Sequence, residues 1–333
     1  LIVADLVVAR NFQGIRALDA ETGDVVWEYQ CETSLDAMVG RFNQLFGRST
    51  QHPGQVGSQL CFQHAFADNS TVGTLTTDGE RVYAVDSLDL SYRPQSRHRA
   101  ADRQSIADPK VSPDSNRLIA LAVRPQVDAG PLAWSVGGPQ TSENQGNLAG
   151  HFFLGPPLSA DGRLYAVTEH DRQLNLVALD PQSGHLHWSQ GIGFVELPIP
   201  EDPMRSAISC SPTYAQGVIV CPTQLGILVG VDAVSGSLLW ASYYGNAEAV
   251  RGFGRWPHTT HRTYGHAGFP DVPQVSGGKL VCMPRHSENV VCLDVHSGEW
   301  LWTIDRNDGE YVAAIDNGTV LVVGRQYCRG LSL

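Results

Sequence analysis

Four stretches of the chain share one frame: ALDAETGDVVW at 17–27, ALDPQSGHLHW at 178–188, GVDAVSGSLLW at 230–240 and CLDVHSGEWLW at 292–302. Each has a small residue, then Asp, then Thr-Gly or Ser-Gly, and ends on Trp. Asp and Ser or Thr side chains can bond nearby backbone N–H groups, and Gly supplies the positive φ that tight turns need. Because an apolar run precedes each turn, the frame predicts a hairpin that is repeated along the chain.

A fifth copy, RPQVDAGPLAW at 124–134, is degenerate and keeps only the glycine and the tryptophan of the frame. A large flat ring at a fixed place in every hairpin has a structural explanation, because it can fill the gap between neighbouring sheets. We therefore interpret the shared residues as structural docking residues. They are Ala17, Asp19, Thr22, Gly23, Trp27, Gly130, Trp134, Asp180, Gly184, Trp188, Asp232, Gly236, Trp240, Asp294, Gly298 and Trp302.

A second repeated element lies upstream of each hairpin. It reads TLTTDGERVYAV at 74–85, PLSADGRLYAV at 157–167, PTYAQGVIVCP at 212–222 and PQVSGGKLVCM at 273–283. Each copy is a short strand, a Gly-centred turn and a longer apolar strand, so element and hairpin together give four antiparallel strands. The repeat tryptophans are 107, 54, 52 and 62 residues apart, and one blade takes roughly 40–50 residues. The sequence predicts an all-β fold, a β-propeller of four-stranded antiparallel blades.

At least six blades are represented, and we expect them to form part of a seven- or eight-bladed ring. Residues 4–27 predict the last three strands of one blade, and residues 311–333 predict the first three strands of another. We expect one propeller domain over 1–333 that is truncated at both ends. Inserted loops at about 31–60 and 89–115 are expected to carry specific binding residues, because loops on a rigid scaffold commonly do.

Composition narrows the functional classes. The 333 residues carry a formal net charge of −11, so the chain lacks the basic character from which nucleic-acid binding draws its affinity. No apolar run is long enough for a transmembrane helix. The seven cysteines include no CxxC and no adjacent pair, so no zinc or redox motif is indicated. No signal peptide is visible, and we interpret the sequence as an excerpt of a longer protein.

The frame resembles the tryptophan-docking motif of PQQ-type quinoprotein dehydrogenases. It is complete at 17–27 and nearly complete in three later copies. The same repeat is found in BamB-like outer-membrane assembly lipoproteins and in large uncharacterised bacterial propeller proteins, and NRLIALAV and SPTYAQGVIVCPT look closest to the last group. The resemblance implies a PQQ-like propeller in the periplasm or cell envelope.

In the dehydrogenases of this family, PQQ lies in the central channel, commonly beside a disulfide between adjacent cysteines, with a Ca²⁺ held by Glu, Asn and Asp. No residue here matches the calcium ligands or the catalytic Asp. The first hypothesis is therefore a non-catalytic scaffold that binds a protein or peptide partner. The alternative is a fragment of a PQQ- and Ca²⁺-dependent alcohol or sugar dehydrogenase, for which catalytic and cofactor-binding residues stay unassigned.

One further stretch has metal-ligating side chains. WPHTTHRTYGH at 256–266 places His258, His261 and His266 in one segment, and imidazoles at such spacing can converge on zinc or copper. The segment contains no carboxylate or Cys as a fourth ligand. The competing interpretation is a polar loop between blades.

Overall fold

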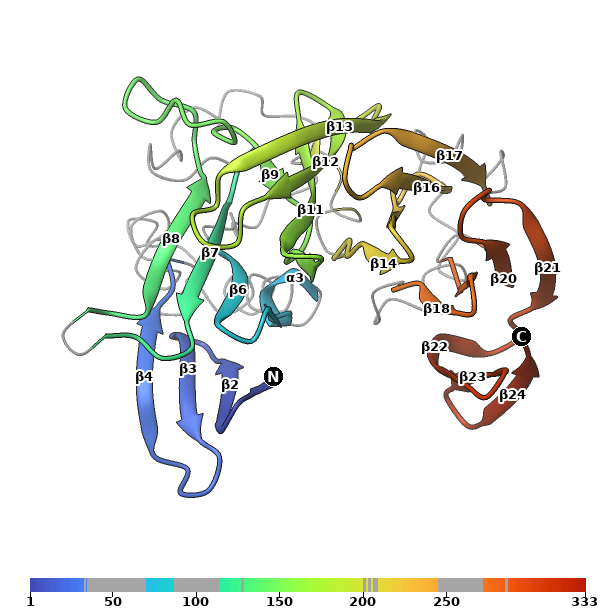
Figure 1. Cartoon of the computed structure of the whole chain (residues 1–333), viewed down its shortest axis with the longest axis horizontal. Helices are drawn as coiled ribbons and strands as arrows, with labels where there is room; N and C mark the ends of the chain where they lie inside the picture. Colours follow the sequence, from blue (N-terminus) through green and yellow to red (C-terminus); the bar gives the residue numbers. More distant parts are fainter. Residues whose placement is uncertain are drawn as a thin grey trace, which may run out of the picture.

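The computed structural model describes residues 1–32, 34, 70–86, 114–126, 129–199, 202, 205, 209–244, 272–284 and 287–333. Strands dominate these residues, and helix α3 (Ser70–Gly73) spans a single turn. The described part of the chain contains no helix with the length and apolar character needed to cross a bilayer. The predicted all-β propeller is confirmed: successive antiparallel sheets follow one another along an open arc, with the chain ends on either side of its opening (Figure 1).

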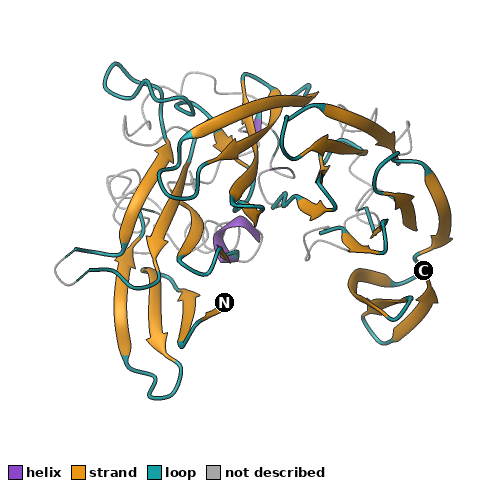
Figure 2. Cartoon of the chain, in the orientation of Figure 1, coloured by secondary structure: helices purple, strands orange, loops and turns teal. Residues whose placement is uncertain are grey.

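Six sheets, called blades 1 to 6 in chain order, are formed by consecutive strands (Figure 2). Blade 1 contains β1 (Ile2–Val3), β2 (Leu6–Arg10), β3 (Gly14–Asp19) and β4 (Val25–Gln30), and blade 2 contains β5 (Thr76–Thr77), β6 (Arg81–Asp86), β7 (Arg117–Ala122) and β8 (Leu132–Gly137). Blade 3 contains β9 (Phe152–Phe153), β10 (Leu158–Ala160), β11 (Arg163–His170), β12 (Gln173–Leu179) and β13 (Leu186–Phe194), and blade 4 contains β14 (Thr213–Ala215), β15 (Val218–Pro222), β16 (Ile227–Asp232) and β17 (Leu238–Tyr243). Blade 5 contains β18 (Gln274–Ser276), β19 (Lys279–Cys282), β20 (Asn289–Asp294) and β21 (Trp300–Asp305), and blade 6 contains β22 (Gly309–Asp316), β23 (Thr319–Gly324) and β24 (Cys328–Ser332).

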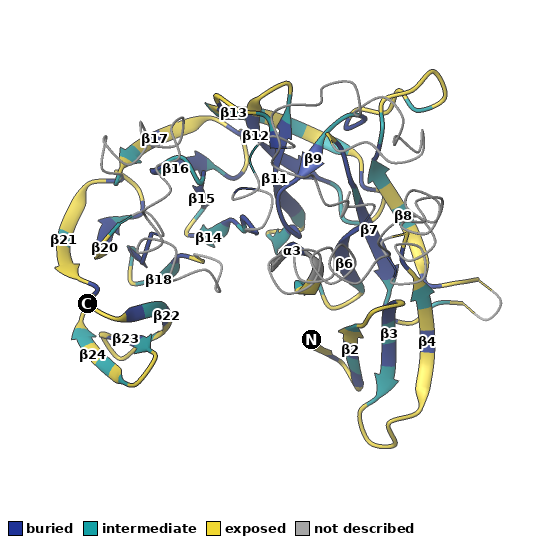
Figure 3. Cartoon of the chain, turned by 180° about the vertical axis from the view of Figure 1, so that it is seen from behind, coloured by how far each residue is buried: buried dark blue, intermediate teal, exposed yellow. Residues whose placement is uncertain are grey.

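The middle strands of blades 2 to 5 are buried on both faces, whereas β2 and β23 in the two end blades contain exposed residues. In β15 every residue is buried, and in β12 all but the first are buried. In blades 2 to 5 a neighbouring blade covers each face of the sheet, so the middle strands need apolar residues throughout and show no polar alternation. The last strand of each four-stranded blade lies at the outside of the arc and is largely exposed, as in β21 (Figure 3).

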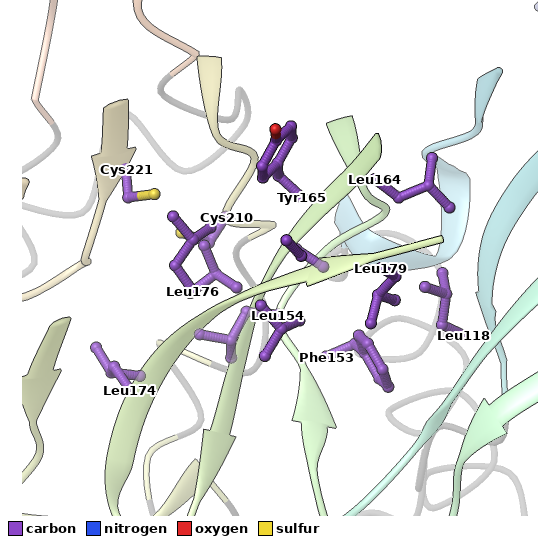
Figure 4. Close-up of a cluster of buried hydrophobic side chains, with 14 of the residues drawn as sticks. Leu118, Phe153, Leu154, Leu164, Tyr165, Leu174, Leu176, Leu179, Cys210 and Cys221 are labelled. Carbon is purple, nitrogen blue, oxygen red and sulfur yellow. The ribbon is translucent and has the colours of Figure 1, made fainter. Parts of the chain in front are cut away.

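The hydrophobic core is divided among the junctions between blades. One cluster joins blades 2, 3 and 4 and includes Leu118, Leu176 and Cys221 (Figure 4). Further clusters join blade 1 to blade 2, blade 4 to blade 5, and blade 5 to blade 6. The apolar side chains that neighbouring blades turn toward each other therefore hold the arc together.

The strand count differs from the prediction in two places. Residues 4–27 give the last three strands of blade 1, β2 to β4, as the sequence predicts. A fourth strand, β1, lies before this range and pairs with β2 through Ile2 and Val7; it was not predicted, because a two-residue strand shows no periodicity. Blade 3 has a fifth strand, β9, which pairs with β11 through Phe153 and Thr168. Blade 6 has the three strands predicted at its end of the chain. Most of the two predicted insertions lies outside the described residues.

Candidate functional site: the indole contacts and the outer strands

The Asp of each repeated turn holds the turn closed. Asp232 Oδ1 accepts hydrogen bonds from the backbone N–H groups of Val234 at 3.2 Å and Ser235 at 2.7 Å, and from the Ser235 hydroxyl at 2.7 Å. The bond from the Ser235 backbone is the largest cause that holds the pKa of Asp232 below its usual value. Gly236 follows with a φ of +74°, a conformation that Gly adopts without a side-chain clash. Asp19, Asp180 and Asp294 make the corresponding contacts.

The tryptophan of one blade lies against this turn in the next blade. Trp240 Nε1 donates a hydrogen bond to the Val295 carbonyl at 2.8 Å. A Cβ added to Gly298 would lie 2.5 Å from Trp240 Cδ2, so only Gly leaves room for the ring. We call this arrangement, a turn Gly under the ring and a backbone carbonyl at the indole nitrogen, an indole socket.

Other junctions repeat parts of this geometry. Trp134 Nε1 donates to the Pro181 carbonyl at 3.0 Å, and its ring lies 2.8 Å from an ideal Cβ on Gly184. Trp27 Nε1 donates to the Val123 carbonyl at 3.0 Å. In that junction the degenerate turn differs, because Gly130 has no positive φ and an added Cβ there would meet nothing within 4 Å. The carbonyl half of the socket is thus kept where the glycine half is lost.

Two tryptophans lack the hydrogen bond. The Nε1 atoms of Trp188 and Trp302 are buried and have no hydrogen-bond partner among the described residues. The Trp188 ring still lies over Gly236, 2.8 Å from an ideal Cβ. The expected acceptor, the Ala233 carbonyl, instead receives the Tyr165 hydroxyl at 3.0 Å and Arg163 at 3.1 Å. Sequence comparison of the repeats could not reveal this, since Trp188 fits the frame as well as Trp240 does.

The predicted metal ligands, His258, His261 and His266, lie outside the described residues, so the structure does not test them. Within the described ranges, no group of three or more His, Cys, Asp or Glu side chains could hold a metal ion. The motif aspartates, which are the recurrent carboxylates, accept hydrogen bonds from their own turns. These aspartates are therefore explained by the turns, and we derive no chemistry through PQQ with Ca²⁺.

A buried ion pair was not predicted. Glu169 and Arg205 are 4% and 7% exposed, and their side chains bond directly to each other. Glu169 Oε1 also accepts from the Ile199 N–H at 2.8 Å, and Arg205 donates to the Leu197 carbonyl at 3.1 Å. The pair fastens the segment after β13 to the end of β11. No periodicity or motif links two residues that are 36 positions apart.

Large apolar side chains are exposed on the outer strands of blades 4 and 5. Among the described residues, β17 and β21 each pair with a strand on one side only. The exposed fractions lie between 38% and 50% for Leu238, Leu239, Tyr243, Trp300, Leu301 and Ile304. Unpaired backbone groups beside exposed apolar side chains are the features that another extended chain can bind.

Comparisons with known proteins show which families and solved structures this chain is similar to. A family model described as outer membrane protein assembly factor BamB matches residues 122–326. BamB from Moraxella catarrhalis is similar in structure, with 13% identity and a TM-score of 0.55, covering 98% of this chain and 70% of that one. Saccharomyces cerevisiae Sqt1 is similar at 10% identity and a TM-score of 0.51, covering 98% of this chain and 68% of its own. A quinohemoprotein alcohol dehydrogenase from Pseudomonas putida gives 13% identity and a TM-score of 0.46 over 95% of this chain and 42% of that one. No curated protein matched the chain.

Proposed function

The chain belongs to the family described as outer membrane protein assembly factor BamB, and from this membership we propose that it is a non-catalytic propeller scaffold of the cell envelope that binds a protein or peptide partner. The rigid part of the proposal is the row of blades, whose junctions are filled by the tryptophan rings and the apolar clusters. The binding part is the outer strands β17 and β21.

The observation that carries the proposal is the exposure of apolar side chains on outer strands that, among the described residues, pair on one side only. Leu239 and Leu301 are each 47% exposed, and Trp300 is 43% exposed. A partner segment in extended conformation can add to such an edge with its backbone and bury these side chains, so main-chain bonds give affinity and side-chain contacts give selectivity. An aromatic side chain such as Trp300 is also the residue type that most often dominates binding energy.

Site-specific photo-crosslinking in cell-envelope extract tests this proposal. A benzoylphenylalanine in place of Leu301 should give a discrete covalent product that Leu239→Lys or Trp300→Lys in the same chain reduces at least tenfold. The matched control is Phe12, which is 57% exposed but lies on blade 1; a crosslinker there should not give the product, and Phe12→Lys should not reduce it. A product of equal yield from both positions, or no dependence on the β17 and β21 substitutions, contradicts the assignment.

The enzymatic alternative is tested separately. The chain is incubated with PQQ and Ca²⁺, and quinone absorbance and reduction of an electron-accepting dye are followed with alcohol or sugar substrates. We expect no saturable uptake and no turnover. Saturable PQQ uptake with dye reduction would overturn the scaffold proposal.

A further inference from the structure

Two histidine rings lie face to face at the junction between blades 2 and 3. The rings of His151 and His170 have centroids 4.6 Å apart and an angle of 5° between their planes. His170 is the last residue of β11, and His151 immediately precedes β9. The residues from 138 to 151, which we call the linker, connect β8 of blade 2 to β9 of blade 3. The stacked pair therefore joins the end of the linker to the sheet.

The hydrogen bonds of the two rings differ. His170 Nδ1 lies 3.2 Å from the Gly150 carbonyl and its Nε2 lies 3.4 Å from Asp171 Oδ2. Both nitrogens thus face acceptors. His151 has one contact, from Nδ1 to Thr168 Oγ1 at 3.1 Å, and a hydroxyl can serve a neutral imidazole as donor. A positive charge on His151 would lie directly against the His170 ring.

Gly150 allows this close approach. Its φ is +80°, and a Cβ there would lie 3.1 Å from His170 Cε1. The neighbouring contacts hold the linker in place: the Gly150 N–H donates to the Gly138 carbonyl at 2.8 Å, and the Asn116 N–H donates to the His151 carbonyl at 3.3 Å. The stacked rings and these backbone bonds keep Leu148 and Phe152 within the core, at 3% and 7% exposure.

From this geometry we propose that the His151–His170 stack is an acid-sensitive latch, which holds the linker closed while His151 is neutral and releases it when His151 is protonated. Release exposes Leu148 and Phe152, so acid conditions uncover an apolar surface between blades 2 and 3. The latch is independent of the outer strands that carry the proposed partner binding.

The charges around the latch favour a neutral His151 in the closed state. Burial, and then the neighbouring His170, lower the pKa of His151 to about 4, and Asp171 opposes this shift. Glu169 points to the other face of β11, where it pairs with Arg205, and Glu143 in the linker is exposed. An opened linker returns His151 to a pKa near 6.5, so a falling pH favours the open state over the window between about pH 6.5 and 4.

Hydrogen exchange of the intact chain tests the latch. Protection of linker amides, corrected for the intrinsic rate at each pH, should fall about twentyfold from pH 7 to pH 5, while amides of β15 and β16 keep theirs. In His151→Phe, which keeps an aromatic ring over His170 without a titrating group, linker protection should not depend on pH. An unchanged linker in the unsubstituted chain, or the same pH dependence in His151→Phe, overturns the proposal.

A second measurement uses the unsubstituted chain and so does not depend on whether a variant folds. NMR titration of the ring Cε1–H signals of the 12 histidines in the unsubstituted chain should show one ring with a pKa far below the others. If all histidines titrate near 6.5, His151 is not held neutral by its surroundings and the latch does not exist.

Discussion

Replacing Trp240 with Phe should cost much more stability than the same substitution at Trp188. Both rings lie over a turn glycine of the next blade, so both variants lose about 40 Å² of apolar contact, or about 1 kcal/mol at roughly 25 cal/mol per Å². Trp240→Phe also leaves the buried Val295 carbonyl without its 2.8 Å donor, which adds about 1–3 kcal/mol. We expect a total loss of about 2–4 kcal/mol in the free energy of unfolding.

Trp188→Phe removes a donor that has no partner. The Trp188 Nε1 atom is buried and unbonded among the described residues, so its removal relieves a desolvation cost of about 1–3 kcal/mol. That gain offsets the lost contact, and the net change should lie between about zero and about 2 kcal/mol of stabilisation.

Urea unfolding followed by far-ultraviolet circular dichroism measures both variants without depending on tryptophan emission. A difference of about 2 kcal/mol moves the midpoint by about 0.7–1 M at a slope of 2–3 kcal/mol/M. Equal midpoints for Trp240→Phe and Trp188→Phe would refute the reasoning, because the hydrogen bond would then contribute nothing to the socket.

Three further outcomes are expected. Gly298 and Gly23 have positive φ values of +69° and +76°, so replacing either with Ala costs about 1–2 kcal/mol of backbone strain. Only at Gly298 does an indole lie 2.5 Å from the added Cβ, so the urea midpoint of Gly298→Ala should fall at least twice as far as that of Gly23→Ala. Equal shifts would show that the ring does not limit the site. The Ser297 backbone hydrogen bond is the largest cause that lowers the pKa of Asp294, so the stabilisation from its carboxylate is present above about pH 4 and is lost as pH falls further. Asp294→Asn should therefore lower the urea midpoint at pH 6 and reduce the loss of that midpoint between pH 6 and pH 3. An unchanged loss between these pH values would contradict this. Glu169→Ala should destabilise the chain by about 3–5 kcal/mol because it leaves Arg205 buried and unpaired, whereas Asp5→Ala, which breaks the exposed pair with Arg124, should cost less than about 1 kcal/mol; comparable thermal midpoints for the two variants would argue against a buried charge.

The repeat frame predicted the blades because it combines turn chemistry with strand-forming runs. Asp232, Ser235 and Gly236 have a local role in the turn that their residue types reveal. The strands β1 and β9 were missed, since two residues carry no alternation and their pairing depends on neighbours far along the chain. Local signals were sufficient for turns and long strands, and insufficient for short strands.

The tertiary contacts could be predicted only in part. The placement of a ring at each junction follows from the spacing of the tryptophans, but whether its N–H finds a carbonyl depends on competitors such as Tyr165, 68 residues from Ala233. The stacked histidines and the Glu169–Arg205 pair likewise arise from the meeting of a connection with the end of β11. His258, His261 and His266 lie outside the described residues, and their role as metal ligands stays a prediction.

The division of the apolar interior among successive junctions has a mechanical consequence. Each blade is stabilised mainly by contacts with the blades beside it, so the loss of packing at one interface between blades should affect only the blades next to it. A lesion in β20 would loosen the contacts of blade 5 with blades 4 and 6, while Leu118 and Leu176 remain packed. Heating or mechanical force should accordingly unfold this molecule one blade interface at a time, in an order set by how stable the packing at each interface is.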